Sequence, residues 1–394
     1  MNRLKKISNV SSLQILAYTL FFVSGMTSTL LGVLLPDVRN DYHFSYFVSG
    51  SVLSAHQIGN LAGGFIAGLL PLFLGRKKST LFLCFGIVIG LLLITITGNP
   101  LLLFIAFFAT GLGRGSSSNI CNVIASEQSS NKTVALNILH ATFAVGALLS
   151  PLLVILLTAK IHINWRVTAW IVAVMEAAAL LMLSKSGLSN VPARKGGKAD
   201  RGFLRSGSFW LITAILFSYL CCESCIVGWL VTYFKDSGMM GATLAASTSS
   251  IVWIMMLAGR LFCAGISNKA NKNKMLIVMA VAQLVFFTVM VLAHNIVVLM
   301  VGLIGLGLSM SGFYPTTFST MDANYISSTV AVGTCTSISN IGAIIMPLVV
   351  GIVAEHTTIT AGFSVIGIAL VTMLVLTLIK KAAASKNINI IQED

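Results

Sequence analysis

Long apolar segments recur from one end of this chain to the other, and no other feature of the sequence constrains the fold as strongly. A helix of about 18 or more uncharged residues can cross a hydrocarbon layer of roughly 30 Å. Charged residues make up only 9% of the chain, against about 25% in soluble proteins. We predict an all-α membrane protein with transmembrane helices at residues 12–36, 47–71, 79–98, 101–125, 134–158, 167–184, 208–234, 242–267, 275–294, 296–320, 328–353 and 358–379.

The positions of the basic residues predict how these twelve helices are oriented. An even number of spans places both termini on one side of the membrane, and lysine and arginine are enriched in cytoplasmic loops. Most of the 25 lysines and arginines lie in the two tails, in the 76–78 loop and in the segments 185–205 and 269–274. We therefore expect cytoplasmic termini and a location in the cytoplasmic (inner) membrane. The net charge of +14 then reflects orientation and attraction to anionic lipid, and it requires no nucleic-acid partner.

A polar segment divides the chain into two halves that resemble each other. Residues 185–207, KSGLSNVPARKGGKADRGFLRSG, are basic and contain several glycines. Around this segment IGNLAGGFIAG at 58–68 recurs as AGRLFCAGISN at 258–268, TGLGRGSSS at 110–118 as IGLGLSMSG at 304–312, and VGALLSPLLV at 145–154 as IGAIIMPLVV at 341–350. Parallel repeats of six spans predict two pseudo-symmetric six-helix bundles with a binding site between them. The expected parts are a bundle at 1–185, a cytoplasmic linker at 186–207, a bundle at 208–381 and a cytoplasmic tail at 382–394.

The loop after the second span carries a family resemblance. GLLPLFLGRKK at 68–78 resembles the G-x-L-a-D-r-x-G-R-K loop of the major facilitator superfamily, and the twelve spans with their central linker resemble that family across the whole chain. Gly75, Arg76 and Lys77 match the motif, whereas Leu72 and Phe73 stand where the family has an acid and a base. The resemblance implies the major facilitator fold and secondary transport, with the usual charge pairing at this loop in doubt.

Three further segments resemble the fucose/glucose-type sugar symporter branch of that family. They are GLGRGSSSNICN at 111–122, LNILHATFAVGALLSP at 136–151 and FSYLCCESCIVGWLVTYF at 217–234. That branch carries an acid followed by Trp and Tyr in the seventh span, which Glu223, Trp229 and Tyr233 match here. The signatures of the larger sugar-porter branch are absent from the sequence. The resemblance therefore implies a sugar as the transported solute.

Glu223 lies at the middle of the predicted seventh span, among Cys221, Cys222 and Cys225. An ionisable side chain at that depth costs about 2.5–3.5 kcal/mol to insert, so it is a functional candidate. In the proteins that this chain resembles, the seventh span lines the central cavity. One hypothesis is that Glu223 carries a coupling proton and stays neutral until substrate or an opposite charge arrives. The other is an interhelical hydrogen-bond anchor with a fixed protonation state. Glu176, in the sixth span, has no evident role.

The cysteines raise the alternative of redox or metal chemistry. The Cys222-x-x-Cys225 spacing occurs in such sites, but no second Cys or His pair lies near it and no βαβ pattern surrounds it. All seven cysteines fall in predicted spans, where they behave as small buried apolar residues. We therefore expect no metal and no cofactor, and a membrane thiol oxidoreductase is the least favoured function.

Arg114 is the other charge near the centre of a predicted span. Small or polar residues accompany it at helical spacing, with Gly111, Gly115 and Asn119 on one face and Arg114, Ser118 and Asn122 on another. The glycines either open space for a solute or let helices pack closely, as GxxxG spacings do. We predict that Arg114, Asn119 and Asn122 contact substrate. Arg114 would hold an anionic group of the substrate or offset the charge of Glu223.

Other polar and aromatic side chains complete the predicted site. The remaining candidates for substrate binding are His56, Gln57 and Asn60 in the second span, Trp229 in the seventh and Asn340 in the eleventh. Trp229 lies near the external end of its span and could instead belong to an interfacial aromatic belt. His140, in the fifth span, is a second candidate for proton coupling. For each histidine the alternative is a satisfied hydrogen-bonding group.

These features together predict a secondary active transporter, not an enzyme. The sequence carries no ATP-binding motif and no soluble catalytic domain. We expect alternating access of a small polar organic solute across the membrane, with a sugar favoured by the resemblance, coupled to protons. The alternative is a proton-driven exporter of drugs or metabolites that uses the same acid. The expected partners are the solute, protons and the lipid bilayer, and the chain is expected to act as a monomer.

Overall fold

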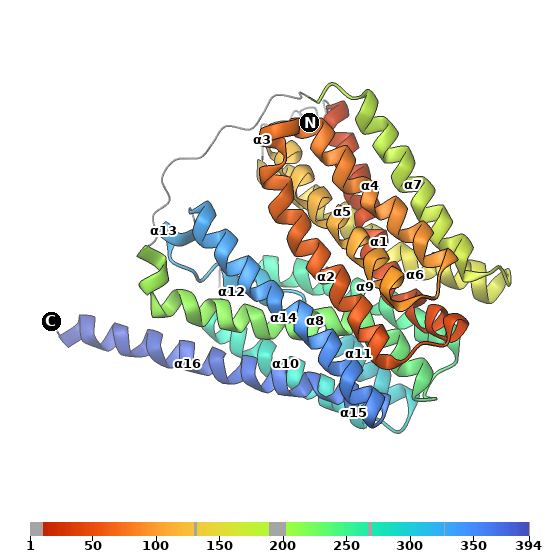
Figure 1. The fold of residues 1–394 in the computed structure, drawn as a ribbon. Helices are drawn as coiled ribbons and strands as arrows, with labels where there is room; N and C mark the ends of the chain where they lie inside the picture. Colours follow the sequence, from red (N-terminus) through yellow and green to blue (C-terminus); the bar gives the residue numbers. More distant parts are fainter. Residues whose placement is uncertain (1–10, 130–131, 189–201, 267–269, 327, 394) are drawn as a thin grey trace, which may run out of the picture. The chain divides into compact units, whose positions relative to one another are not determined.

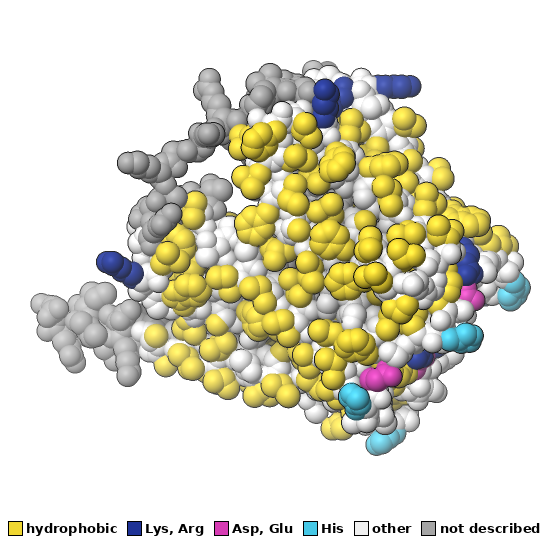
Figure 2. Space-filling model, viewed as in Figure 1, with side chains coloured by type: hydrophobic (Ala, Val, Ile, Leu, Met, Phe, Trp, Pro, Cys, Tyr) yellow, Lys and Arg dark blue, Asp and Glu magenta, His cyan; other side chains and the backbone are white. Residues whose placement is uncertain are grey.

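The structure, a computed structural model, describes residues 11–129, 132–188, 202–266, 270–326 and 328–393. Helix is the only regular secondary structure in these ranges. They contain 12 helical segments long and apolar enough to cross a membrane, which confirms the predicted fold class. Hydrophobic side chains cover most of the face seen in Figure 2, and charged side chains lie toward its margins.

The chain divides into two compact units, of which unit 1 comprises Met1–Phe44 and Ser51–Gly196. Its helices (Figure 1) are α1 (Ser12–Tyr42), α2 (Tyr46–Leu69, whose first turn belongs to unit 2), α3 (Pro71–Leu74), α4 (Arg76–Ile96), α5 (Pro100–Glu127), α6 (Lys132–Val154), the π-helical η2 (Ile155–Lys160) and α7 (Trp165–Lys185). Within unit 1, α1 packs against α5, α6 and α7, and α4 packs against α5 and α7.

Unit 2 comprises Ser45–Gly50 and Gly197–Asp394. Its helices are the 3₁₀ turn η3 (Gly202–Arg205), α8 (Gly207–Asp236), α9 (Ala242–Ile266), α10 (Lys272–Leu292), α11 (Ile296–Met310), α12 (Phe313–Phe318), α13 (Ala323–Ile326), α14 (Thr329–His356), α15 (Ile359–Ser364) and α16 (Ile366–Glu393). In this unit α8 packs against α14 and α16, and α10 packs against α11 and α16. In both units the first span packs against the fifth and sixth, and the third span packs against the fourth and sixth. The packing of unit 2 thus repeats that of unit 1, as the sequence repeat predicts.

Several boundaries differ from the predicted ones. Most of the predicted linker, 189–201, lies outside the described residues. The predicted tail at 382–394 continues helix α16 as far as Glu393. The tenth span, predicted as one helix at 296–320, is broken at Ser311 and Gly312 into α11 and α12. That break exposes backbone carbonyls inside unit 2, and the candidate site uses them.

The 68–78 loop is charge-paired within unit 1, although two of the family's charged positions are apolar here. Gly75 has φ 75°, a conformation that glycine adopts without strain. Arg76, at the start of α4, donates to Glu127 at the end of α5, with Nη1–Oε2 2.8 Å. Lys77 donates to the carbonyl of Ser186 at 2.9 Å. The loop thereby holds together the ends of three helices, α4, α5 and α7.

Helix α4 shows why these units require a bilayer. One face, which includes Leu83 and Ile87, is buried against neighbouring helices. The opposite face exposes Phe82 (69%), Phe85 and Ile89. Such a continuous apolar surface is a liability in water, whereas lipid tails solvate it. The chain is therefore a multi-pass membrane protein.

Candidate functional site

Glu223 is the centre of a cluster in unit 2. It lies near the middle of α8 and its side chain is partly exposed. Tyr219, one turn earlier and buried, lies within hydrogen-bonding reach of the Glu223 carboxylate. Tyr314, on α12, is also near enough to Glu223 for an electrostatic interaction. The acid predicted from the sequence is thus bordered by two phenol groups, those of Tyr219 and Tyr314.

The break between α11 and α12 supplies hydrogen-bond acceptors to this cluster. The last carbonyls of a helix have no partner in their own helix, and here three side chains from other helices donate to them. Tyr219 Oη donates to Met310 O at 3.1 Å, Arg260 Nε to Ser311 O at 3.4 Å, and Gln283 Nε2 to Ser309 O at 3.3 Å. Interrupted helices of this kind form the binding sites of many transporters, because irregular backbone offers polar groups inside the membrane.

Arg260 is a member of the cluster that the sequence analysis missed. Its guanidinium acts electrostatically on Tyr219, as Glu223 does, so a cation and an acid both lie near one phenol. A signal was present in the internal repeat, which aligns Arg260 in AGRLFCAGISN with Asn60 in IGNLAGGFIAG. The repeat places both at the crossing of the second span of each half with its fourth.

In unit 1, His56 and Arg114 lie close together between α2 and α5. The Nδ1 of His56 is 2.9 Å from Thr110 Oγ1, and that hydroxyl donates to the carbonyl of Phe107 at 2.6 Å. His56 must therefore be the donor, which fixes its tautomer. Arg114, also near His56, places its guanidinium 5.7 Å from the ring centre of Phe143 on α6. His56 is 5% exposed, which suits a hydrogen-bonded anchor between α2 and α5.

The glycines of α5 serve close packing against α2. A Cβ atom on Gly111 would overlap the carbonyl oxygen of His56, and one on Gly115 would overlap that of Asn60. These two positions therefore need glycine for the approach of the helices. Asn119, on the same face, is exposed and donates to the carbonyl of Gly64 at 3.4 Å.

The other predicted polar residues make local contacts. The amides of Asn122 and Asn340 each donate at 2.7 Å to a carbonyl one turn earlier in their own helix, that of Ser118 and that of Thr336. Gln57 is partly exposed and His140 is exposed. The His140 ring packs edge-on against Phe21 of α1, with ring centres 5.4 Å apart.

Trp229 is fully buried, so in this structure it offers no open ring face to a solute. Its indole N–H donates to the carbonyl of Pro347 on α14 at 3.2 Å. Its ring lies 6.3 Å from that of Tyr46, in the turn of α2 that belongs to unit 2. Both alternatives from the sequence, a stacking platform and an exposed interfacial belt, need an accessible ring. The observed role is packing between helices.

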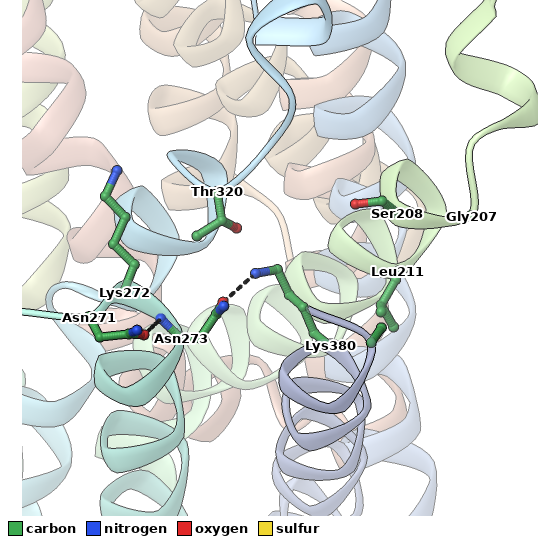
Figure 3. A pocket seen from close by; sticks show the side chains of 9 residues that line it. Gly207, Ser208, Leu211, Asn271, Lys272, Asn273, Thr320 and Lys380 are labelled. Atoms are coloured by element: carbon green, nitrogen blue, oxygen red, sulfur yellow. Dashed lines mark hydrogen bonds between the residues drawn. The ribbon is translucent and has the colours of Figure 1, made fainter. Parts of the chain in front are cut away.

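A separate pocket of about 630 Å³ lies at one end of unit 2. Figure 3 shows Lys380 reaching toward Asn273, to which it donates at 2.7 Å. The full lining is Gly207, Ser208, Leu211, Asn271, Lys272, Asn273, Thr320, Lys380 and Ala383. Glu223 is about 24 Å further along α8 from Gly207, at 1.5 Å per residue. The pocket is therefore distinct from the Glu223 cluster, and its two ammonium groups suit an anion better than a neutral solute.

The thiols and carboxylates form no evident metal or redox centre. No group of three or more His, Cys, Asp or Glu side chains with metal-binding proximity occurs in the described part of the chain. All seven cysteines are free. Cys222 donates to Ser218 O in its own helix at 3.3 Å, and Cys225 is completely buried.

Comparison with known proteins identifies a family. The sequence profile described as Major Facilitator Superfamily matches residues 17–336. A gallate transporter of Pseudomonas putida is 22% identical over an alignment of 362 residues, and the match covers 77% of this chain and 78% of that protein.

Solved structures of transporters share the fold. A variant of the nucleoside transporter NupG matches with a TM-score of 0.76 and 15% identity, over 94% of this chain and 99% of that one. A bacterial homologue of the human lysosomal transporter Spinster matches at 0.76 and 11%, over 94% and 96%. A D-xylose–proton symporter matches at 0.74 and 13%, also over 94% and 96%.

Proposed function

The chain belongs to the Major Facilitator Superfamily and is a secondary transporter, and on this premise we propose that it couples a small polar organic solute to protons bound at Glu223. The solute would cross by alternating access, with its site exposed to one side of the membrane at a time. We place the protein, as a monomer, in the cytoplasmic membrane with both termini inside.

The observation that carries this proposal is the cluster of Glu223, Tyr219 and Arg260 at the α11–α12 break. An acid inside a span is expensive unless it is protonated or paired. Here both options are within reach, because the acid and a cation both lie near Tyr219. Protonated Glu223 is neutral and needs no partner, whereas ionised Glu223 attracts the phenol hydroxyl and the guanidinium.

Two protonation states with different partners can bias a conformational equilibrium. A ligand shifts such an equilibrium only through different affinities for the two states. The proton acts as that ligand if the arrangement of Glu223 and Arg260 differs between the inward-facing and outward-facing conformations. Arg114, the counter-charge predicted from the sequence, lies in unit 1 and remains a second candidate for this role.

The solute that fits the unit 1 cluster best is a small organic anion with an aromatic or other flat apolar part. Arg114 supplies a guanidinium that can hold a carboxylate in bidentate fashion. Phe143 lies beside that guanidinium and can pack against a ring. The curated relative that matches most of this chain transports gallate by its name, and gallate is an aromatic carboxylate. We therefore place this class before the sugar predicted from the sequence, which is the second candidate.

Uptake into proteoliposomes tests the proposal. Vesicles that contain the purified protein receive an imposed pH gradient and radiolabelled gallate, other aromatic carboxylates or D-xylose. We expect one class to accumulate above equilibrium and to lose that accumulation when a protonophore dissipates the gradient. Movement of solute in the direction opposite to the protons would indicate an antiporting exporter. Uptake unaffected by the protonophore would contradict proton coupling.

A further inference from the structure

Glu176, on α7, is buried in unit 1 without a partner. Its side chain is 0% exposed, and neither carboxylate oxygen has a hydrogen-bond partner among the described residues. A polar group in that position costs several kcal/mol if it is charged, and much less if it is neutral. The geometry alone therefore favours a carboxylic acid over a carboxylate.

The neighbours of Glu176 are thiols and hydroxyls. It lies near enough to Cys84 on α4 and Cys121 on α5 for an electrostatic interaction with each thiol. The Cys84 thiol can donate to Gly113 O at 3.7 Å and is 3.2 Å from Ser117 Oγ. The Cys84 thiol is therefore engaged with α5, and no described side chain donates to the Glu176 carboxylate.

No cation of the surrounding helices pairs with Glu176 among the described residues, and Arg114 on α5 lies near His56 and Phe143. The buried residues of α1, which packs against α7, include no ionisable side chain. His140 of α6 and Lys160 of η2 are exposed. On α7 itself, Arg166 and Lys185 lie about 15 Å and about 13 Å along the axis. On α4, Arg76 pairs with Glu127.

We propose that Glu176 is a proton-binding site inside unit 1, occupied by a proton in this structure. Unit 1 thus carries an ionisable group of its own at the packed seam of α4, α5 and α7, separate from Glu223 in unit 2. Loss of the proton would leave an uncompensated anion in that seam, so the packing of unit 1 is sensitive to pH. This inference does not depend on which solute is transported or on coupling through Glu223.

Infrared spectroscopy of the purified protein tests the protonation state directly. A protonated carboxylic acid has a carbonyl stretch that a carboxylate lacks. We expect this band at neutral pH in the wild type and in Glu223→Gln, which removes the other acid from a span centre, and we expect its loss when Glu176→Gln is added to Glu223→Gln. The matched control is Glu127→Gln, because Glu127 is an exposed glutamate of the same unit, and this variant should keep the band. Absence of the band from Glu223→Gln at neutral pH would overturn the proposal even if no Glu176 variant folds.

Thermal unfolding across pH supplies a second readout. Raising the pH should lower the melting temperature of the wild type, because the unfolded chain solvates the anion and the folded seam does not. Glu176→Gln and the apolar Glu176→Met cannot ionise and should lose this part of the pH dependence, whereas Glu127→Gln should retain it. An unchanged pH dependence in a folded Glu176 variant would contradict the inference.

Discussion

At the scale of single residues, two glutamates inside spans differ in what surrounds them. Glu223 is partly exposed and has the Tyr219 phenol within reach, and Arg260 also lies near that phenol. Glu176 is fully buried and has no partner among the described residues. A site that must take up and release protons during transport needs access and a means of stabilising both forms. The first acid meets these conditions in this structure, and the second does not.

Replacing Glu223 by Gln should uncouple transport from protons. Gln mimics the protonated acid in shape and charge, so folding and the exchange of solute across vesicles should persist. Accumulation driven by a pH gradient should fall to the equilibrium level, because no group at this position gains or loses charge. Solute uptake in proteoliposomes with and without the gradient measures both properties. If this variant concentrates solute like the wild type, Glu223 is not the coupling acid, and His140 becomes the next candidate.

Arg114→Ala should weaken solute binding by about 10- to 100-fold, the loss expected for a charge-assisted hydrogen bond of about 1.5–3 kcal/mol. Arg114→Lys keeps the charge but not the two-pronged geometry, so it should bind with intermediate affinity. Calorimetry with the best solute from the uptake screen gives the three affinities. Equal affinity in all three folded proteins would return Arg114 to a structural role.

At the scale of helices, glycine determines how closely α2 and α5 approach. Gly59 and Gly63 on α2 face the backbone of α5 as closely as Gly111 and Gly115 on α5 face that of α2. One close glycine contact recurs in unit 2, where a Cβ on Gly259 of α9 would overlap the Ser311 side chain and approach the carbonyl of Leu308. The sequence repeat therefore preserves a helix crossing, and the polar positions beside it, Asn60 and Arg260, diverge.

Gly111→Ala tests this crossing, and Gly64→Ala is its matched control. An alanine at position 111 would collide with the His56 carbonyl, at a cost of about 1–3 kcal/mol from overpacking. Position 64 has open space where a Cβ would stand, and alanine there should be neutral or stabilising by up to about 1 kcal/mol through helix propensity. Melting temperatures in detergent compare the two. A Gly111→Ala protein as stable as Gly64→Ala would show that the helices separate without cost.

At the scale of the whole molecule, the basic loops predict which side of the membrane each terminus faces. A fluorescent protein that matures only in the cytoplasm should fluoresce when fused after Asp394 of the full chain. The same reporter fused after Gly238, just past the seventh predicted span, should remain dark, because that loop is expected to be external. Whole-cell fluorescence at matched expression measures both. Bright signal from the second fusion, or a dark first fusion, would reverse the predicted topology.

The sequence by itself determined the membrane class, the twelve spans and the family. These follow from local properties, since each apolar helix satisfies its own backbone and must match the thickness of the bilayer. It also nominated Glu223 and Arg114 as candidates, because a charge at a span centre stands out in any apolar run. It could not show that Arg260 lies near Tyr219 or that a helix break at Ser311 and Gly312 provides acceptors.

Only the tertiary structure decided the burial of Trp229, the closeness of Gly111 to His56 and the isolation of Glu176. Each of these depends on helices far apart in sequence that approach to within a few ångströms. A membrane span is largely apolar on its lipid-facing side as well as on its packed side. The sequence therefore does not reveal which face of a helix meets a partner. Whether a buried polar group is paired or alone is decided by that meeting, because the cost of its burial depends on the atoms across the interface.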